Sequence, residues 1–281
     1  MKVSVIIPTY NEQEVILDCL KSLNSQSFKD MEIIVVDDGS TDKTLERVQG
    51  TGYRVQLLQQ QHKGPGQARN LGAKNSSGEI LVFVDADMTF EKDFIKNLVK
   101  PIIDGKAIGA FSKEEYVLNK GNVWSKCWNI NKGLPVDKMH PKNYPDTQPV
   151  FRAILKKEFE KAGGFTPIGY IDDYTISEQL GIQATAAPGA IFYHRNPETL
   201  REIFNQARWI GKSEYKRRKI KDENLMRLVT IVRYSVLLSL INGIYKSLRF
   251  NIPQFLLFKM IYDFAVEVSL VGSFFGEQKY K

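Results

Sequence analysis

The first third of the chain alternates short apolar runs with segments in which apolar residues recur every three or four positions. Apolar runs typical of buried strands cover residues 3–7, 32–36, 54–59 and 80–84. Residues 12–23 carry apolar side chains at helical spacing, and a glycine-rich turn from Gly64 to Gly66 leads into a further helix. Strands that alternate with helices predict an α/β fold with a mostly parallel sheet covered on both faces.

The pattern is less regular after residue 108. Strands are predicted over 108–111, 151–155 and 184–193, and helices over 156–162 and 174–180. Residues 112–148 are too long for a structureless loop, so we expect a short helix over 123–131 and a mobile flap. We therefore divide the chain into residues 1–110, 111–222 and 223–281.

The last segment follows a basic cluster that runs from Lys212 to Lys221, and it contains two apolar stretches, residues 228–245 and 253–275. Polar residues recur in these stretches at helical spacing: Ser235, Ser239, Asn242 and Lys246, then Lys259, Asp263 and Glu267. A spanning helix needs about 20 mostly apolar residues. We therefore expect two amphipathic helices lying on a membrane, with a soluble hairpin packed on the core or on a dimer partner as the alternative.

Composition restricts the class of protein. The 281 residues are 43% hydrophobic and 25% charged, which predicts a chain that is folded throughout. The net charge of +7 favours an anionic partner, such as a nucleotide diphosphate, a lipid phosphate or a nucleic acid. Cys19 and Cys127 are the only cysteines, so we expect no disulfide framework and a reducing, cytosolic setting.

Polar side chains follow three of the predicted strands. Tyr10 follows the first, Asp38 the second, and Asp85-Ala86-Asp87 the fourth. The carboxyl ends of parallel strands meet at one edge of the sheet, where α/β proteins bind ligands. Two carboxylates separated by one residue suit a divalent cation, although Asp-x-Asp also occurs in surface turns.

Neighbouring polar residues have simpler explanations. We expect Asp37 and Asp42 to serve the turn, and Ser40 or Thr41 to cap the helix that follows. The turn from Gly64 to Gly66 lacks the Lys-Ser/Thr ending of a P-loop and the glycine spacing of a dinucleotide fold. An NTPase or a dehydrogenase is therefore disfavoured.

Four motifs in order resemble those of family 2 glycosyltransferases of GT-A fold: Val5 to Glu12, Asp37 to Asp42, Gly66 to Gly72 and Asp85 to Asp87. The resemblance continues through Gly163-Gly164-Phe165 and Asp172-Asp173-Tyr174, so it covers about three quarters of the chain. It implies transfer of a sugar from a nucleotide-sugar, with inversion at the anomeric carbon and Mg²⁺ or Mn²⁺ as cofactor. Residues 1–110 are then the nucleotide-sugar half of the domain, and residues 111–222 the acceptor half.

The resemblance assigns nucleobase recognition to the first two motifs. Pro8 and Tyr10 are expected to line the base pocket, with the Tyr10 ring stacked on the base. Asp38 is expected to accept a hydrogen bond from uracil or guanine. Glu12 belongs to the same donor-binding motif, although an acid there also suits the start of a helix.

The resemblance assigns binding of the diphosphate and the metal to the later motifs. The resemblance places Arg69 at the donor diphosphate or sugar, Asp85 near the ribose or the metal, and Asp87 on the metal itself. His194, after the last predicted strand, resembles the third metal ligand of GT-A enzymes, and imidazole suits Mn²⁺ better than Mg²⁺. An ordinary histidine at a strand end remains the alternative.

The acceptor half carries the expected base. Asp172-Asp173 stands where the family usually has Glu-Asp, so Asp173 is expected to be the general base, and the shorter Asp172 leaves open which of the two acts. Capping of the next helix by both is the alternative. The segment from Gln206 to Trp209 is one residue short of the Gln-x-x-Arg-Trp signature of processive synthases. Arg208 and Trp209 are expected to close over the diphosphate or acceptor, with core packing of Trp209 as the alternative.

We therefore expect a metal-dependent inverting glycosyltransferase that moves a sugar from a UDP- or GDP-sugar to a hydroxyl of a glycan or lipid-linked acceptor. The N-terminus enters a predicted strand at once without a cleavable signal, so we expect a peripheral or monotopic protein at the cytoplasmic face of the membrane. A polyprenyl-phosphate glycosyltransferase is the nearest alternative and a nucleotidyltransferase a more distant one. A nucleic-acid partner is not expected, because acids at the strand ends repel phosphate without a metal.

Overall fold

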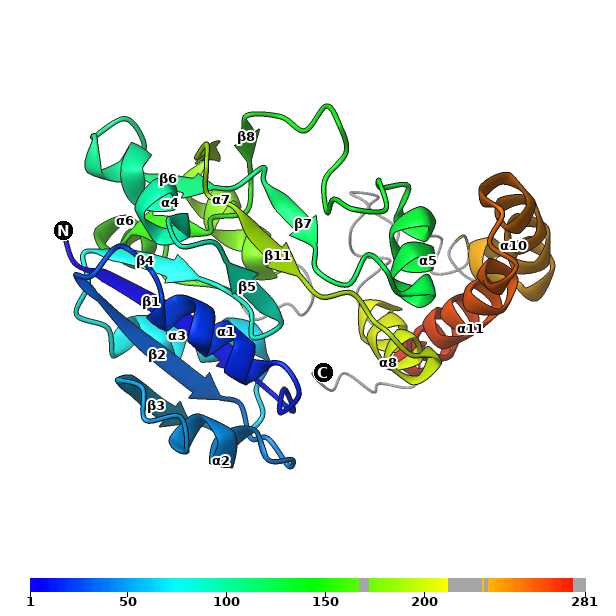
Figure 1. Ribbon diagram of the computed structural model, residues 1–281, viewed down its shortest axis with the longest axis horizontal. Helices are drawn as coiled ribbons and strands as arrows, with labels where there is room; N and C mark the ends of the chain where they lie inside the picture. The colour runs from blue at the N-terminus through cyan, green and yellow to red at the C-terminus, as the bar shows by residue number, and fades with distance from the viewer. Residues whose placement is uncertain (167–171, 212–228, 230–231, 275–281) are drawn as a thin grey trace. The chain divides into compact units, whose positions relative to one another are not determined.

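The computed structural model describes residues 1–166, 172–211, 229 and 232–274, and the chain forms two compact units (Figure 1). The first unit comprises Met1–Tyr116, Lys142–Ile168 and Asp172–His194, and the second comprises Val117–Pro141, Gly169–Ile171 and Arg195–Lys281. The boundary predicted at residue 110 falls within a strand, β6 (Gly109–Phe111). Residue 222 and the basic cluster that begins at Lys212 lie outside the described residues.

The first unit is built on an eight-stranded sheet with the order β3-β2-β1-β4-β9-β6-β10-β8. Its strands are β1 (Val3–Thr9), β2 (Met31–Asp37), β3 (Val55–Gln59), β4 (Ile80–Phe83), β6, β8 (Thr147–Gln148), β9 (Ala153–Leu155) and β10 (Ala184–Ala186). The first four strands in this order run parallel to one another, and β6 runs parallel to β10. β9 is antiparallel to both β4 and β6, and β8 is antiparallel to β10. The α/β fold is confirmed, and the sheet is mixed, with four parallel and three antiparallel pairs of neighbouring strands. Two consecutive parallel strands must be joined by a crossover. The chain instead passes through several other elements between β4 and β9, and β9 enters the sheet in the opposite direction.

The single strand predicted over 184–193 is in fact two strands in different sheets. β10 belongs to the large sheet, and β11 (Phe192–His194) is the middle strand of a second sheet with the order β5-β11-β7. Its other strands are β5 (Met88–Phe90) and β7 (Glu115–Val117). The break lies at Pro188, which cannot donate to a strand ladder, and at Gly189, whose φ of +77° favours glycine.

Helices cover both faces of the large sheet, as the apolar runs predict. Val3, Val5 and Ile7 pack in one core cluster with residues of α1 (Ile16–Asn24), α2 (Thr44–Gln49) and α4 (Phe94–Ile103). The alternate residue of β1, Ile6, packs on the other face with residues of α3 (Pro65–Lys74), α6 (Lys156–Lys161) and α7 (Thr175–Leu180). Successive side chains of a strand point to opposite faces, so β1, which is buried along nearly its whole length, needs both layers.

The turn before α2 differs in detail from the prediction. The helix begins at Thr44 after Lys43, and neither Ser40 nor Thr41 caps it. Asp42 Oδ1 instead accepts a hydrogen bond of 2.9 Å from the Thr44 amide. The turn role predicted for Asp37 is confirmed, because its carboxylate accepts the Ser40 amide.

The second unit is helical. Its helices are α5 (Val123–Lys132), α8 (Leu200–Gly211), α10 (Val236–Phe250) and α11 (Gln254–Phe274). Its core centres on Trp128 of α5, whose ring meets those of Phe258 and Tyr262 of α11 edge to face. α5 matches the helix predicted over 123–131, and the Asn122 side chain caps it by accepting the amides of Trp124 and Ser125.

We expect Gly72→Ala to lower the free energy of unfolding by about 1–3 kcal/mol, because overpacking costs more than the helix propensity of alanine returns. A Cβ at Gly72 of α3 would lie 2.5 Å from Ile6 Cγ2 and 3.2 Å from Val36 Cγ2. Gly121→Ala is the matched control, since a Cβ there meets no described atom within 4 Å. Urea unfolding of the two variants measures the difference, and equal stabilities would contradict this close approach of α3 to the sheet.

Candidate functional site

The predicted residues gather at one edge of the large sheet, as the strand ends implied. β1 lies between β2 and β4 and parallel to both, so their carboxyl ends are adjacent. Tyr10 follows β1, Asp38 follows β2, and Asp85 and Asp87 follow β4. Three groups of contacts form there, around Asp38, Asp85 and Asp87.

Asp38 organises the segment from Gln60 to Gly64. Its carboxylate is almost fully buried and accepts hydrogen bonds from Gln60 Nε2 (2.6 Å), from the amides of Lys63 and Gly64 (both 2.8 Å), and pairs with His62 Nδ1 (2.9 Å). The predicted role of Asp38 in base recognition stays a prediction. It requires that one of these hydrogen-bond donors of the protein leave the Asp38 carboxylate.

The Tyr10 ring is already stacked in the structure. His62 lies against it with ring centroids 4.1 Å apart and an interplanar angle of 23°. The backbone around Tyr10 is fixed to the next turn, because the amide of Glu12 donates to Thr44 Oγ1 (2.8 Å). His62 was not among the predicted residues, since a single histidine in a polar loop gives no signal in the sequence.

Asp85 is held between two arginines. Arg69 Nη2 lies 2.8 Å from Asp85 Oδ1, and Arg152 Nη1 lies 3.3 Å from Asp85 Oδ2. Burial opposes ionisation of Asp85, but the two guanidinium charges outweigh it and hold the pKa of this carboxyl well below its usual range. Arg152 was missed by the sequence reasoning. It could have been noticed as the one basic residue within the apolar strand predicted over 151–155.

Arg69 also links this pair to the predicted catalytic acids. Its Nη1 lies 3.2 Å from Asp172 Oδ1. Asp172 approaches α3 so closely that a Cβ on Gly66 would lie 2.5 Å from Asp172 Oδ2. The glycine of the third motif therefore makes room for a carboxylate at the first turn of a helix, where negative charge is favoured.

Asp173 is the less constrained of the two acids. Its Oδ1 is buried and has no hydrogen-bond partner among the described residues. Burial raises the pKa of Asp173 to about 6, although Arg69 opposes the shift. Because Asp172 is occupied by Arg69, this geometry favours Asp173 as the acid that is free to take a proton.

Asp87 and His194 are brought together, as predicted. His194 Nε2 lies 3.1 Å from Asp87 Oδ2, and His194 Nδ1 lies 2.8 Å from Glu115 Oε1. Burial lowers the basicity of His194, but the neighbouring Asp87 and Glu115 raise its pKa to about 10. Sequence reasoning missed Glu115, which β7 brings to this point from an irregular stretch of the chain.

The donor set of this group fits a divalent cation. Asp87 Oδ1 is buried and has no hydrogen-bond partner in the described part of the chain, and imidazole with carboxylate oxygen suits Mn²⁺. No group of three or more His, Cys, Asp or Glu residues converges on a common point in the described ranges. Asp87 and His194 would therefore need the oxygens of a bound ligand to complete a coordination shell.

Arg208 and Trp209 belong to α8 in the second unit. The Arg208 guanidinium lies 5.8 Å from the centre of the Phe204 ring, and its carbonyl accepts a hydrogen bond from Ser269 of α11. Their predicted closure over the diphosphate or acceptor stays a prediction.

Comparison with known proteins identifies a family. A model described as glycosyl transferase family 2 matches residues 4–163, more than half of the chain. Glycosyltransferase GlyA of Streptococcus pneumoniae is 38% identical over 109 residues, which are 38% of this chain and 16% of that protein. The poly(ribitol-phosphate) beta-N-acetylglucosaminyltransferase TarS of Staphylococcus aureus is 41% identical over 103 residues, 34% of this chain and 18% of TarS. The chain thus covers under a fifth of the length of these curated relatives.

Solved structures show a similar fold over nearly the whole chain. S. aureus TarS 1-349 in complex with UDP-GlcNAc has a TM-score of 0.58 and 18% identity, covering 97% of this chain and 92% of that one. The mannosyltransferase PcManGT from Pyrobaculum calidifontis, in complex with GDP-Man and Mn²⁺, has a TM-score of 0.61 and 20% identity, covering 97% and 87%. At these identities the likeness concerns the fold.

Asp173→Asn is expected to stabilise the protein in a pH-dependent way. The folded-state pKa of about 6 exceeds the ordinary value near 3.9, so the folded protein holds this proton more tightly and loses stability as pH rises through 6. Asparagine cannot ionise. The variant should match the original protein near pH 4 and be about 2 kcal/mol more stable at pH 8, less than the full shift would give, because the side chain is only partly buried.

Denaturant unfolding between pH 4 and 8 measures this difference. Asp146→Asn is the control, because the Asp146 side chain is 84% exposed and its effect on stability should change little with pH. A constant difference between Asp173→Asn and the original protein would show that Asp173 ionises normally.

Proposed function

Because the chain belongs to glycosyl transferase family 2, we propose that it transfers a sugar from a UDP- or GDP-sugar to a hydroxyl group of a glycan or lipid-linked acceptor. The observation that carries this proposal is the meeting of three groups at one sheet edge. Tyr10 and Asp38 suit a nucleobase, Arg69 reaches both Asp85 and Asp172, and Asp87 lies against His194. These are the parts that binding and cleaving a nucleotide-sugar require.

The donor chemistry follows from the same residues and from the relatives. A TarS structure holds UDP-GlcNAc, and the PcManGT structure holds GDP-Man. Uracil and guanine both present a ring N–H that a carboxylate accepts, so Asp38 suits either nucleotide. Arg69 has a planar fork of donors, which suits phosphate oxygens as well as it suits the carboxylates that it now holds.

A divalent cation, Mn²⁺ or Mg²⁺, is the proposed cofactor, with Asp87 and His194 as its protein ligands. Such a cation neutralises the charge that develops on the departing nucleoside diphosphate. The orphaned Oδ1 of Asp87 supports this assignment from within the chain. The Mn²⁺ in the PcManGT complex supports it from outside.

Asp173 is the proposed general base. A carboxyl with a pKa of about 6 is ionised at neutral pH and still basic enough to take a proton from an attacking hydroxyl. Its Oδ1 has no hydrogen-bond partner among the described residues, which leaves a lone pair for that proton. Asp172 pairs with Arg69 instead, which supports Asp173 rather than Asp172 as the base.

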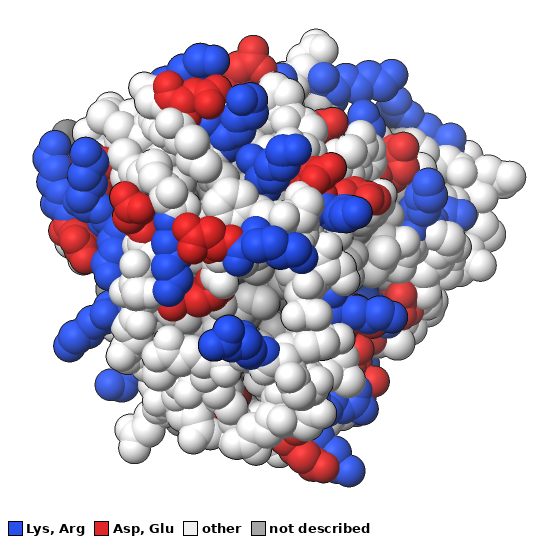
Figure 2. Space-filling model, turned by 60° about the vertical axis from the view of Figure 1, so that its left-hand side comes forward, with Lys and Arg blue, Asp and Glu red and all other residues white. Residues whose placement is uncertain are grey.

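One alternative differs in the acceptor. If the acceptor is a polyprenyl phosphate, it is already an anion and needs no base. The family assignment leaves a nucleotidyltransferase without support. The expected absence of a nucleic-acid partner stays a prediction. On the face drawn in Figure 2, Lys and Arg are interspersed with Asp and Glu.

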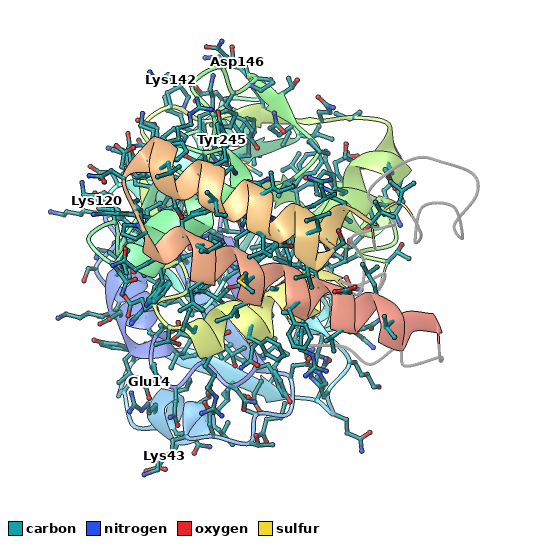
Figure 3. The ribbon with its side chains drawn as sticks, turned by 90° about the vertical axis from the view of Figure 1, so that its right-hand side faces the viewer. Glu14, Lys43, Lys120, Lys142, Asp146 and Tyr245 are labelled. Atoms are coloured by element: carbon teal, nitrogen blue, oxygen red, sulfur yellow. The ribbon has the colours of Figure 1, made fainter. Side chains whose placement is uncertain are left out.

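We further propose that α10 attaches the protein to the cytoplasmic face of a membrane. No helix in the described part of the chain is both long and apolar enough to cross a bilayer. The exposed residues of α10 are nevertheless mostly apolar, and they include Val236, Leu237, Ile241, Ile244, Tyr245 and Leu248. Figure 3 shows α10 and α11 side by side, with Tyr245 labelled on α10.

Several polar residues of this helix pair face inward. Ser239 of α10 is buried and donates to Asp263 of α11, which also pairs with Lys259 Nζ at 2.6 Å. Lys246 Nζ donates to the carbonyl of Ile130 in α5 (2.9 Å). Ser239 of the α10 stripe therefore meets Asp263 of the α11 stripe, whereas Asn242 of the same α10 stripe is exposed. The exposed side of α10 is still mostly apolar. Arg249 of α10 is exposed and basic, which suits anionic lipid headgroups.

Asp173→Asn is expected to reduce sugar transfer by at least 100-fold while leaving donor binding unchanged, because a general base acts on the acceptor. Donor binding is measured as the rise in melting temperature with UDP- and GDP-sugars in Mn²⁺, Mg²⁺ or chelator. Asp146→Asn again serves as control and should retain full turnover. Transfer that survives in Asp173→Asn would overturn the base assignment and favour a phosphate acceptor.

Leu248→Glu is expected to weaken binding to vesicles that contain phosphatidylglycerol by about tenfold or more, since burying a leucine contributes about 1.5–3 kcal/mol. The Leu248 side chain is 79% exposed, so the fold should tolerate the change. Ile182→Glu is the matched control, an exposed apolar residue in the first unit. Cosedimentation measures binding. If the protein does not bind vesicles but forms a dimer that Leu248→Glu dissociates, the proposal is wrong, and this face of α10 binds a second copy of the chain.

A further inference from the structure

The second, smaller sheet brings together three side chains that are far apart in the sequence. Asp87 immediately precedes β5, His194 ends β11, and Glu115 begins β7. The sheet order β5-β11-β7 places the histidine on the middle strand, between the two acids. Each acid contacts a different nitrogen of the same ring, Asp87 at Nε2 and Glu115 at Nδ1.

The two nitrogens of an imidazole do different work when one of them binds a metal. The ligating nitrogen must present a lone pair, so the remaining proton has to sit on the other nitrogen. A carboxylate beside that other nitrogen accepts the proton's hydrogen bond, fixes the tautomer and makes the ring a stronger ligand. Glu115 Oε1, 2.8 Å from Nδ1, occupies this position.

We propose that Glu115 is a positioning residue that keeps the proton of His194 on Nδ1 and thereby directs Nε2, together with Asp87, toward a divalent cation. This inference rests on the cation use proposed above. Glu115 acts through His194 and does not touch the cation, because it lies at the nitrogen that faces away from Asp87.

The burial of Glu115 supports a specific role. The residue is only 7% exposed, and burying a carboxylate is costly unless it is paired. A backbone carbonyl would orient a histidine without that cost, so a buried charge at Nδ1 indicates a function that needs a strongly basic imidazole. The second sign of a ligand is Asp87 Oδ1, which is buried beside the same ring and makes no hydrogen bond to any described residue.

Glu115→Gln tests the inference, because it keeps the shape of the side chain and removes its charge. The amide group can also donate to Nδ1, which favours the tautomer with the proton on Nε2, and that tautomer has no lone pair at Nε2 for a metal. We expect Mn²⁺ binding in the presence of UDP, measured by electron paramagnetic resonance, to weaken about tenfold. This is the lower end of the usual range for such partners, because glutamine retains an acceptor.

Two further variants define the scale. His194→Ala removes the ligand and gives the affinity without imidazole. Glu91→Gln is the matched control, since Glu91 directly follows β5 of the same small sheet and its Oε1 accepts a hydrogen bond from the Tyr193 hydroxyl (2.8 Å), not from His194. It should bind Mn²⁺ as the original protein does. UDP binding in chelator separates positioning from damage to the fold, and it should be the same in all variants.

The outcomes distinguish the inference from the function on which it rests. Mn²⁺ affinity in Glu115→Gln equal to that of the original protein would overturn the inference and leave the proposed function intact. Weakened UDP binding in chelator would show that Glu115 has a structural role only, and would also overturn it. If the original protein itself binds no Mn²⁺ with UDP, the proposed cofactor and the inference fail together.

Discussion

The site depends on one buried arginine that forms ion pairs with two acids from distant parts of the sequence. Arg69 lies in α3, while Asp85 follows β4 and Asp172 lies just before α7, and its guanidinium contacts both carboxylates. Without it, the two acids would face each other in a poorly solvated space, a cost of several kcal/mol. The arginine therefore holds the strand end and the acid loop at a fixed separation, and it leaves Asp173 beside them with an unpaired oxygen.

Much of this arrangement could be predicted because it depends on local patterns. Apolar runs located β1 to β4, and polar residues after them identified Tyr10, Asp38, Asp85 and Asp87, because parallel strands bring their carboxyl ends together. The contact between Asp87 and His194 was expected only from the family resemblance, since 107 residues separate them. The α/β class and the α5 helix followed from hydrophobic periodicity.

The remaining features depend on tertiary contacts that no local pattern encodes. Arg152 directly precedes β9, and Glu115 begins β7. Each is a single charged residue whose role is recognisable only because the fold brings Asp85 beside Arg152 and His194 beside Glu115. The antiparallel course of β9 depends on a long excursion of the chain. The stripes of α10 and α11 were recognised as polar, but periodicity cannot say whether such a stripe faces water or another stripe.

The loop held by Asp38 has a consequence for the energetics of nucleotide recognition. This carboxylate already accepts hydrogen bonds from the protein at both oxygens, so a base that approaches it exchanges one bond for another. The affinity gained there is the difference between two hydrogen bonds, which is small compared with either. His62 is a partner of Asp38 and also covers Tyr10. Selectivity among bases then depends on how strongly each base binds Asp38 compared with the residues of the loop that bind Asp38 in its absence.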